Sequence, residues 1–205
     1  MVTVEARPDH RDRQLRAAVR LVALLNLGYF GIEFVVARAI GSVSLFADSI
    51  DFLEDASVNG LILVALRWDA RRRSIVGMIL AAILFAPAVA TAWTAWAKFN
   101  APIPPAPLPM SLTGLGALAV NLFCALLLAR YRSHSDSLTR AAFLSARNDA
   151  LANVAIIIAG VVTGLTLSPW PDLVVGLGIF LMNLDASREV YGAARDERRA
   201  ALAKP

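Results

Sequence analysis

Four carboxylates lie close together in the stretch Asp48-Ser-Ile-Asp-Phe-Leu-Glu-Asp55, and the chain on both sides of it is apolar. If the stretch is helical, Asp48, Asp51 and Asp55 fall within about 60° of each other around the helix axis, and Glu54 extends this stripe by roughly another 60°. Acidic groups inside an apolar segment are costly unless a cation or protons neutralise them. The stretch therefore indicates a site for positive charge.

A second polar face follows about a hundred residues later. On a helix, Ser145, Asn148 and Asp149 lie on one side of the axis. The pairs Ser145/Asp149 and Asp51/Asp55 share a four-residue spacing, which places two side chains one above the other. If the two pairs face each other, their oxygens can form a four-coordinate site for one divalent cation. Asp48 or Asn148 can add a further oxygen or relay protons.

The composition is that of an integral membrane protein. Hydrophobic residues make up 58% of the 205 residues and the mean hydropathy is +0.60, whereas soluble domains are about 45–50% apolar. The length allows about six spanning helices. We expect an all-α bundle of six transmembrane helices in residues 17–191, between a cytoplasmic tail, 1–16, and a short charged tail, 192–205.

The apolar runs predict where the six spans and their connectors lie. Five prolines in residues 101–109 predict an extended connector, residues 168–172 predict a tight turn, and Gly41 closes the first span. The single cysteine, Cys124, excludes a disulfide framework and is expected to pack in a span. The spans are expected at about Ala17–Arg38, Ser44–Trp68, Ile75–Trp96, Leu112–Tyr131, Ala141–Leu165 and Leu173–Tyr191.

The positive charges predict the orientation of the bundle. Lys and Arg gather at the two termini and after spans two and four, whereas the alternate connectors hold only Arg38 and Lys98. Because cytoplasmic loops carry the excess of Lys and Arg, both termini are expected in the cytoplasm. No basic face remains once the spans are drawn, so nucleic acid is not expected as a partner.

These motifs together resemble the cation diffusion facilitator family of metal/proton antiporters. The resemblance covers about residues 15–195 and rests on four stretches. They are Gly41-Ser-Val-Ser-Leu45, Asp51-x-x-x-Asp55, Arg140-Ala-Ala-Phe-Leu-Ser-Ala-Arg-Asn-Asp-Ala150 and Trp170-Pro-Asp-Leu-Val-Val-Gly-Leu-Gly-Ile179. Six spans with both ends in the cytoplasm also match the family.

The resemblance implies a metal site made by two residues of span two and two of span five. Asp51, Asp55 and Asp149 match that pattern, whereas Ser145 stands where the family commonly has His. A serine hydroxyl is a weak, hard ligand, so zinc is less expected and an oxygen-only site suits Mn²⁺, Fe²⁺, Co²⁺ or Mg²⁺ better. Zinc, cobalt, iron, manganese and cadmium are not distinguished.

The resemblance also implies a mechanism and partners. Metal would displace protons from the clustered carboxylates, and alternating access would export the metal from the cytoplasm by exchange for protons. No permanently bound cofactor is expected. The chain stops fourteen residues after Tyr191, so we expect it to lack the family's cytoplasmic domain and to form a homodimer through its transmembrane helices. The expected location is the bacterial inner membrane, as a multi-pass protein.

Two other functions stay open. The spacing Asp48-x-x-Asp51-x-x-x-Asp55 is also similar to a magnesium-diphosphate motif of intramembrane prenyltransferases, and an intramembrane phosphotransferase is a related alternative, but no enzyme is expected. A non-transporting membrane partner or sensor of the same family is the other alternative. Glu33 and the intramembrane asparagines are expected to pack or to bond between helices; these are Asn26, Asn59, Asn121 and Asn183.

Overall fold

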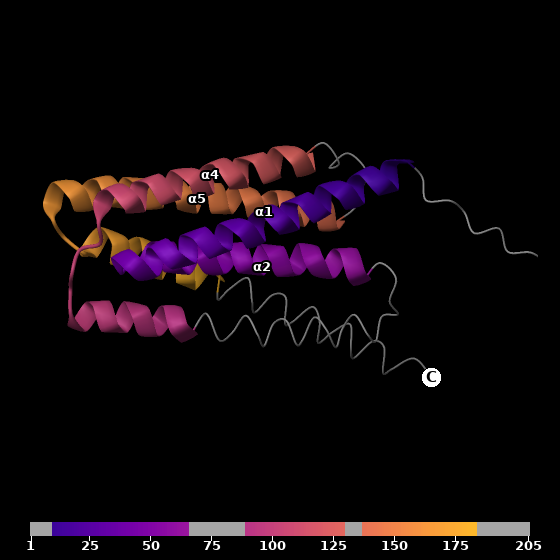
Figure 1. Cartoon of the computed structure of the whole chain (residues 1–205). Coiled ribbons are helices and arrows are strands. Elements are labelled where there is room, and N and C mark those ends of the chain that lie inside the picture. The colour runs from indigo at the N-terminus through magenta and orange to yellow at the C-terminus, as the bar shows by residue number, and fades with distance from the viewer. Residues whose placement is uncertain (1–9, 66–88, 130–136, 184–205) are drawn as a thin grey trace, which may run out of the picture.

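The computed structural model describes residues 10–65, 89–129 and 137–183, and this part of the chain contains helices and no strand. Four helices have both ends described. They are α1 (His10–Ile40), α2 (Val43–Ala65), α4 (Pro107–Ala129) and α5 (Ser137–Thr166) (Figure 1). Two further helical segments cover residues 89–100 and Trp170–Asn183. The predicted all-α architecture is confirmed.

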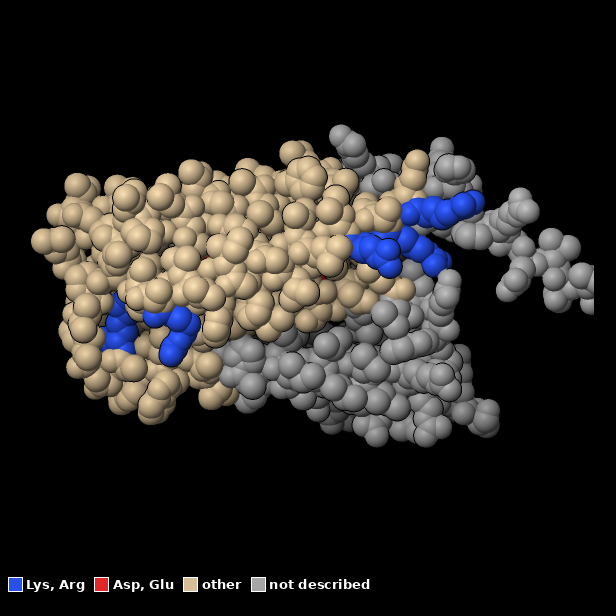
Figure 2. All heavy atoms as spheres, viewed as in Figure 1, with Lys and Arg blue, Asp and Glu red and all other residues tan. Residues whose placement is uncertain are grey.

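Three described helical stretches are long and apolar enough to cross a membrane: Arg13–Ile40, Pro107–Ala129 and Asn148–Thr166. The surface in Figure 2 is consistent with this reading, because blue cationic side chains gather at the two ends with an uncharged tan region between them. Almost no red appears on that face. Burial agrees with this view, because Glu33, Asp48 and Asp172 are buried and Asp51, Glu54, Asp55 and Asp149 are half-buried.

The helices pack as two main pairs. α1 lies along α2, and α4 lies along α5, while α2 and α5 meet over a much smaller area (Figure 1). Aromatic rings join the first pair: Tyr29 and Phe52 have centroids 5.1 Å apart, and Phe34 and Phe46 have centroids 5.5 Å apart. The polar faces of α2 and α5 lie at the interface between the two pairs.

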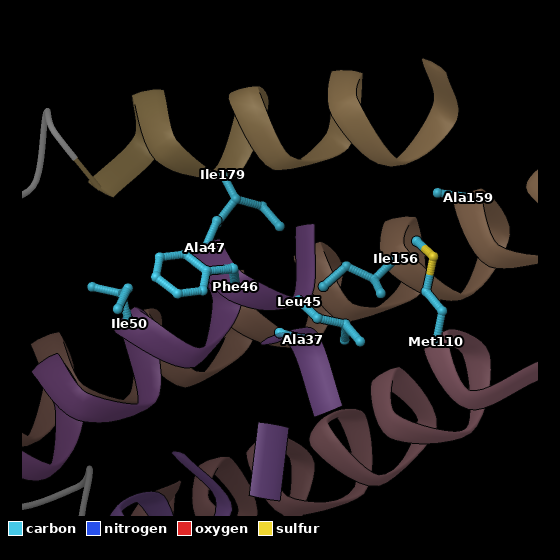
Figure 3. Close-up of a cluster of buried hydrophobic side chains, with 9 residues drawn as sticks. All are labelled: Ala37, Leu45, Phe46, Ala47, Ile50, Met110, Ile156, Ala159 and Ile179. Atoms are coloured by element: carbon cyan, nitrogen blue, oxygen red, sulfur yellow. The ribbon is translucent and has the colours of Figure 1, made fainter. Parts of the chain in front are cut away.

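The largest apolar core lies beside the first half of α2. Figure 3 shows Leu45 and Phe46 of α2 close to Met110 of α4, Ile156 of α5 and Ile179 of the last described helix. Leu45, Met110 and Ile156 are completely buried. This core draws on five helical elements, so it holds α2 in place next to the acidic stretch.

The helix boundaries correct the expected connector. Residues 101–106 are non-helical as predicted, but α4 begins at Pro107 and includes Pro109. Proline is accepted in the first turn of a helix because its missing N–H would have no helical partner there. The last described helix likewise begins at Trp170, with Pro171 next, where a tight turn was expected.

Other predicted boundaries are confirmed or lie outside the described residues. Gly41 ends α1 with φ +67°, a conformation that glycine adopts without strain. α1 begins at His10, earlier than expected, and α5 extends slightly beyond its predicted span at both ends. Most of the third predicted span, the end of the sixth, the C-terminal tail and the first nine residues of the N-terminal tail fall among residues 1–9, 66–88, 130–136 and 184–205, which are not described.

Candidate metal site

The acidic stretch is part of α2, and its four carboxylates occupy different environments. Asp48 is completely buried, whereas Asp51, Glu54 and Asp55 are half-buried. The helix is continuous through this stretch, and the apolar residues between the carboxylates include Ile50 and Phe52, which are 6% and 2% exposed. The predicted helical stripe is therefore present in the structure.

α5 brings Asp149 to this stripe. Asp149 lies close enough to Asp51 and Asp55 for direct electrostatic repulsion, and its carboxyl group is within hydrogen-bonding reach of that of Asp55. On the other side, Asn26 Nδ2 of α1 makes a long contact of 3.5 Å with Asp55 Oδ2. Three helices thus direct polar atoms to one region in the otherwise apolar bundle.

The fourth predicted ligand is not described in the same detail. Ser145 lies in α5, four residues before Asp149, but its side chain and that of Arg147 are outside the described part. Asn148 is exposed on the surface of α5. Among the described side chains, no three acidic, histidine or cysteine residues converge closely enough to hold a metal ion, so this ligand set stays a prediction.

Glu33 is a polar residue of this region that we expected only to pack. It lies in α1, is completely buried, and its carboxyl group is within hydrogen-bonding reach of that of Asp48. Within the described part of the chain, none of the four carboxyl oxygens of this pair has a hydrogen-bond donor. In the sequence, Glu33 could have been singled out because it is an isolated acidic residue inside a long apolar run.

The intramembrane asparagines only partly follow the prediction of bonds between helices. Asn26 does contact other helices, because its Oδ1 is 4.0 Å from the Sγ of buried Cys124 on α4 and its Nδ2 faces Asp55. Asn59 instead donates to the carbonyl of Asp55 in its own helix at 2.8 Å. Asn153, which that prediction did not name, donates to the carbonyl of Asp149 at 2.8 Å, and its buried Oδ1 has no partner among the described residues.

Comparison with known protein families gives a match over most of the chain. Residues 19–193 match the family model described as the cation efflux transmembrane domain. This range includes α2, α5 and every residue of the acidic region. A search among curated proteins gave no match.

Proposed function

The chain belongs to the cation efflux family, and from this premise we propose that it exports a divalent transition-metal cation from the cytoplasm in exchange for protons. Members of this family are transporters of metal cations, so the coarse function follows from the match. The direction of transport, the coupling to protons and the identity of the ion are the proposal. The family also weighs against the intramembrane transferase alternative.

The observation that carries the proposal is that Asp51 and Asp55 on α2 lie within electrostatic range of Asp149 on α5. Carboxylates that approach each other in an apolar bundle need positive charge between them. A divalent cation supplies that charge, and carboxylate and hydroxyl oxygens favour hard ions such as Mn²⁺, Fe²⁺ or Co²⁺. We propose Asp51, Asp55, Asp149 and Ser145 as the ligands.

Proton exchange is supported by the neighbouring pair, Glu33 and Asp48. Two buried carboxylates this close repel each other, and a proton or a cation between them relieves the repulsion. When metal enters a carboxylate site it releases protons. We propose that protons and metal alternate in this region, and that relative movement of the α1–α2 and α4–α5 pairs opens it to either side.

The location and assembly of the protein are also proposed. A multi-pass bundle of this kind lies in a cell membrane, and we propose the bacterial inner membrane. We further propose a homodimer formed through transmembrane helices. Large exposed apolar side chains along α1 and α4 provide a surface for lipid and for a second copy; they include Leu24, Val35, Leu108, Leu112 and Leu126.

The test of this function is transport by purified protein in liposomes. With an acidic lumen and metal outside, we expect metal to accumulate inside while protons leave, followed with a metal-sensitive dye and a pH-sensitive dye. Asp51→Ala and Asp149→Ala should abolish both signals, because each removes one carboxylate of the proposed site. Glu5→Ala, which removes a carboxylate from the N-terminal tail, is the matched control and should transport normally.

Two results would count against the proposal. Transport by Asp149→Ala at the wild-type rate would exclude the proposed site. Metal uptake with no proton signal under any gradient would exclude proton exchange while leaving metal transport intact.

A further inference from the structure

Asp172, at the start of the last described helix, caps the N-terminus of α2 from across the bundle. Its Oδ1 accepts hydrogen bonds from Ser42 Oγ and Ser44 Oγ, both at 2.7 Å, and from the Ser44 amide at 3.0 Å. Its Oδ2 accepts the Val43 amide at 2.9 Å. The first amides of a helix have no partner within the helix, so a carboxylate from another helix satisfies them here.

A buried lysine completes this group. Lys98 Nζ lies 2.6 Å from Asp172 Oδ2 and 2.6 Å from the carbonyl oxygen of Gly41. Lys98 is only 8% exposed and Asp172 is completely buried. The ammonium group therefore joins the end of segment 89–100 to the turn between α1 and α2 and to the last described helix.

Close backbone packing also fixes the contact between the last described helix and α2, and this packing does not depend on charge. Gly176 lies one helical turn after Asp172, and a Cβ atom there would be 2.7 Å from Val43 Cγ1 and 2.8 Å from the Ser44 nitrogen. Real Cβ atoms do not approach other atoms so closely. The last described helix and the first turn of α2 are therefore as near as a glycine permits.

We propose that Asp172 is a positioning residue for transport, which sets the height and rotation of α2 and so places Asp51 and Asp55 opposite Asp149. The inference rests on the proposed metal site. Along a helix that rises 1.5 Å per residue, Asp51 and Asp55 lie roughly 12 and 18 Å from Val43. Because a shift of one residue rotates a helix by about 100°, the fixed start of α2 determines which side chains face α5.

The experiment compares metal transport by Asp172→Asn, Asp172→Ala and Lys98→Met with the wild type. We expect the metal concentration for half-maximal transport to rise about tenfold or more in Asp172→Ala, as for loss of a hydrogen bond to a charged group. Asp172→Asn keeps one acceptor oxygen and should lie between Asp172→Ala and the wild type. Arg38→Gln removes an exposed cation near the same end of the bundle and should leave this concentration unchanged.

The readout separates positioning from a merely structural role. A residue needed only for folding would lower the amount of active protein, and hence the maximal rate, without changing the half-saturating concentration. Hydrogen exchange of the wild-type and Asp172→Asn proteins, which needs no transport, should show faster exchange at the Val43 and Ser44 amides, with little change in α4.

Two outcomes would overturn the inference: an unchanged half-saturating concentration in Asp172→Ala, or unchanged exchange at these amides in Asp172→Asn. A wild-type protein that moves no metal would instead refute the proposed function, and the exchange measurement would still test whether Asp172 fixes the start of α2.

Discussion

The carboxylates of α2 fall into two groups by their partners on other helices. Asp51 and Asp55 approach Asp149 of α5, whereas Asp48 lies beside Glu33 of α1 in complete burial. The two groups are about one helical turn apart on the same stripe. In the proposed function, the first group binds the metal and the second group lies on the proton path.

The identity of residue 145 should set which metal is preferred. Ser145→His replaces a hard hydroxyl with an imidazole nitrogen, which suits zinc better. We expect zinc to gain affinity over manganese by roughly tenfold, an increment typical of one added ligand interaction. Titration of the purified protein with a panel of divalent ions measures this ratio.

The matched control for this substitution is Thr166→His, which adds the same ring at an exposed position roughly 25 Å from Asp149 along α5. It should leave the zinc-to-manganese ratio near the wild-type value. An unchanged ratio in Ser145→His would show that Ser145 does not contact the ion.

The part of the site that follows from spacing was predicted, and the part that depends on distant contacts was not. Asp51 and Asp55 were predicted as ligands because a four-residue interval places them on one helix face, and Asp149 because it repeats that interval with Ser145. The pairing of Glu33 with Asp48 depends on how α1 lies against α2, which no local pattern specifies. The same holds for Asp172 and Lys98, which are separated by 74 residues.

At the scale of the helices, Tyr29 links α1 to both of its neighbours. Its hydroxyl donates to the carbonyl oxygen of Thr113 in α4 at 2.6 Å, and its ring packs on Phe52 of α2. A Cβ atom at Gly116 would collide with this hydroxyl. A side chain at position 116 would therefore force the Tyr29 ring to shift.

Gly116→Ala should destabilise the bundle despite the better helix propensity of alanine. We expect a loss of about 1–3 kcal/mol from the forced shift of Tyr29, measured by reversible unfolding in mixed micelles. In a Tyr29→Phe background the loss should shrink, because the colliding hydroxyl is gone.

Gly178→Ala provides the control, since a Cβ there meets no atom within 4 Å. It should be neutral or stabilising by up to about 1 kcal/mol. An equal loss for Gly116→Ala in both backgrounds would mean that Tyr29 does not cause it.

The prediction of the helices themselves was limited at their ends. The apolar runs located α1, α2, α4 and α5, because length and hydropathy together identify a span. The Pro-rich run 101–109 was read as wholly extended, yet its last prolines open α4. Composition alone does not tell whether a proline ends a helix or begins one, because the missing N–H of proline is compatible with both positions.

For the whole molecule, the cations at the two ends bear on its orientation in the membrane (Figure 2). The excess of Lys and Arg predicts that the termini are cytoplasmic, and therefore that Asn100 is outside. Cys124 is the single cysteine and is buried, so a Cys124→Ser chain allows single cysteines to be placed at will.

In that background, a cysteine from Asn100→Cys should react with a membrane-impermeant maleimide in intact cells. A cysteine from Arg13→Cys should react only after the membrane is permeabilised. Both positions are exposed in the structure, so accessibility from each side is the difference measured. The reverse pattern would invert the proposed direction of export.

The cap on α2 also has a consequence for how the protein is made. Ser42 and Asp172 are 130 residues apart in the chain, so the ribosome finishes α2 well before it synthesises the carboxylate that caps it. At cellular rates of elongation this interval is on the order of ten seconds. During that time the first amides of α2 must rely on Ser42 or water, and the outer turn of the acidic helix reaches its final position only when the last helix arrives.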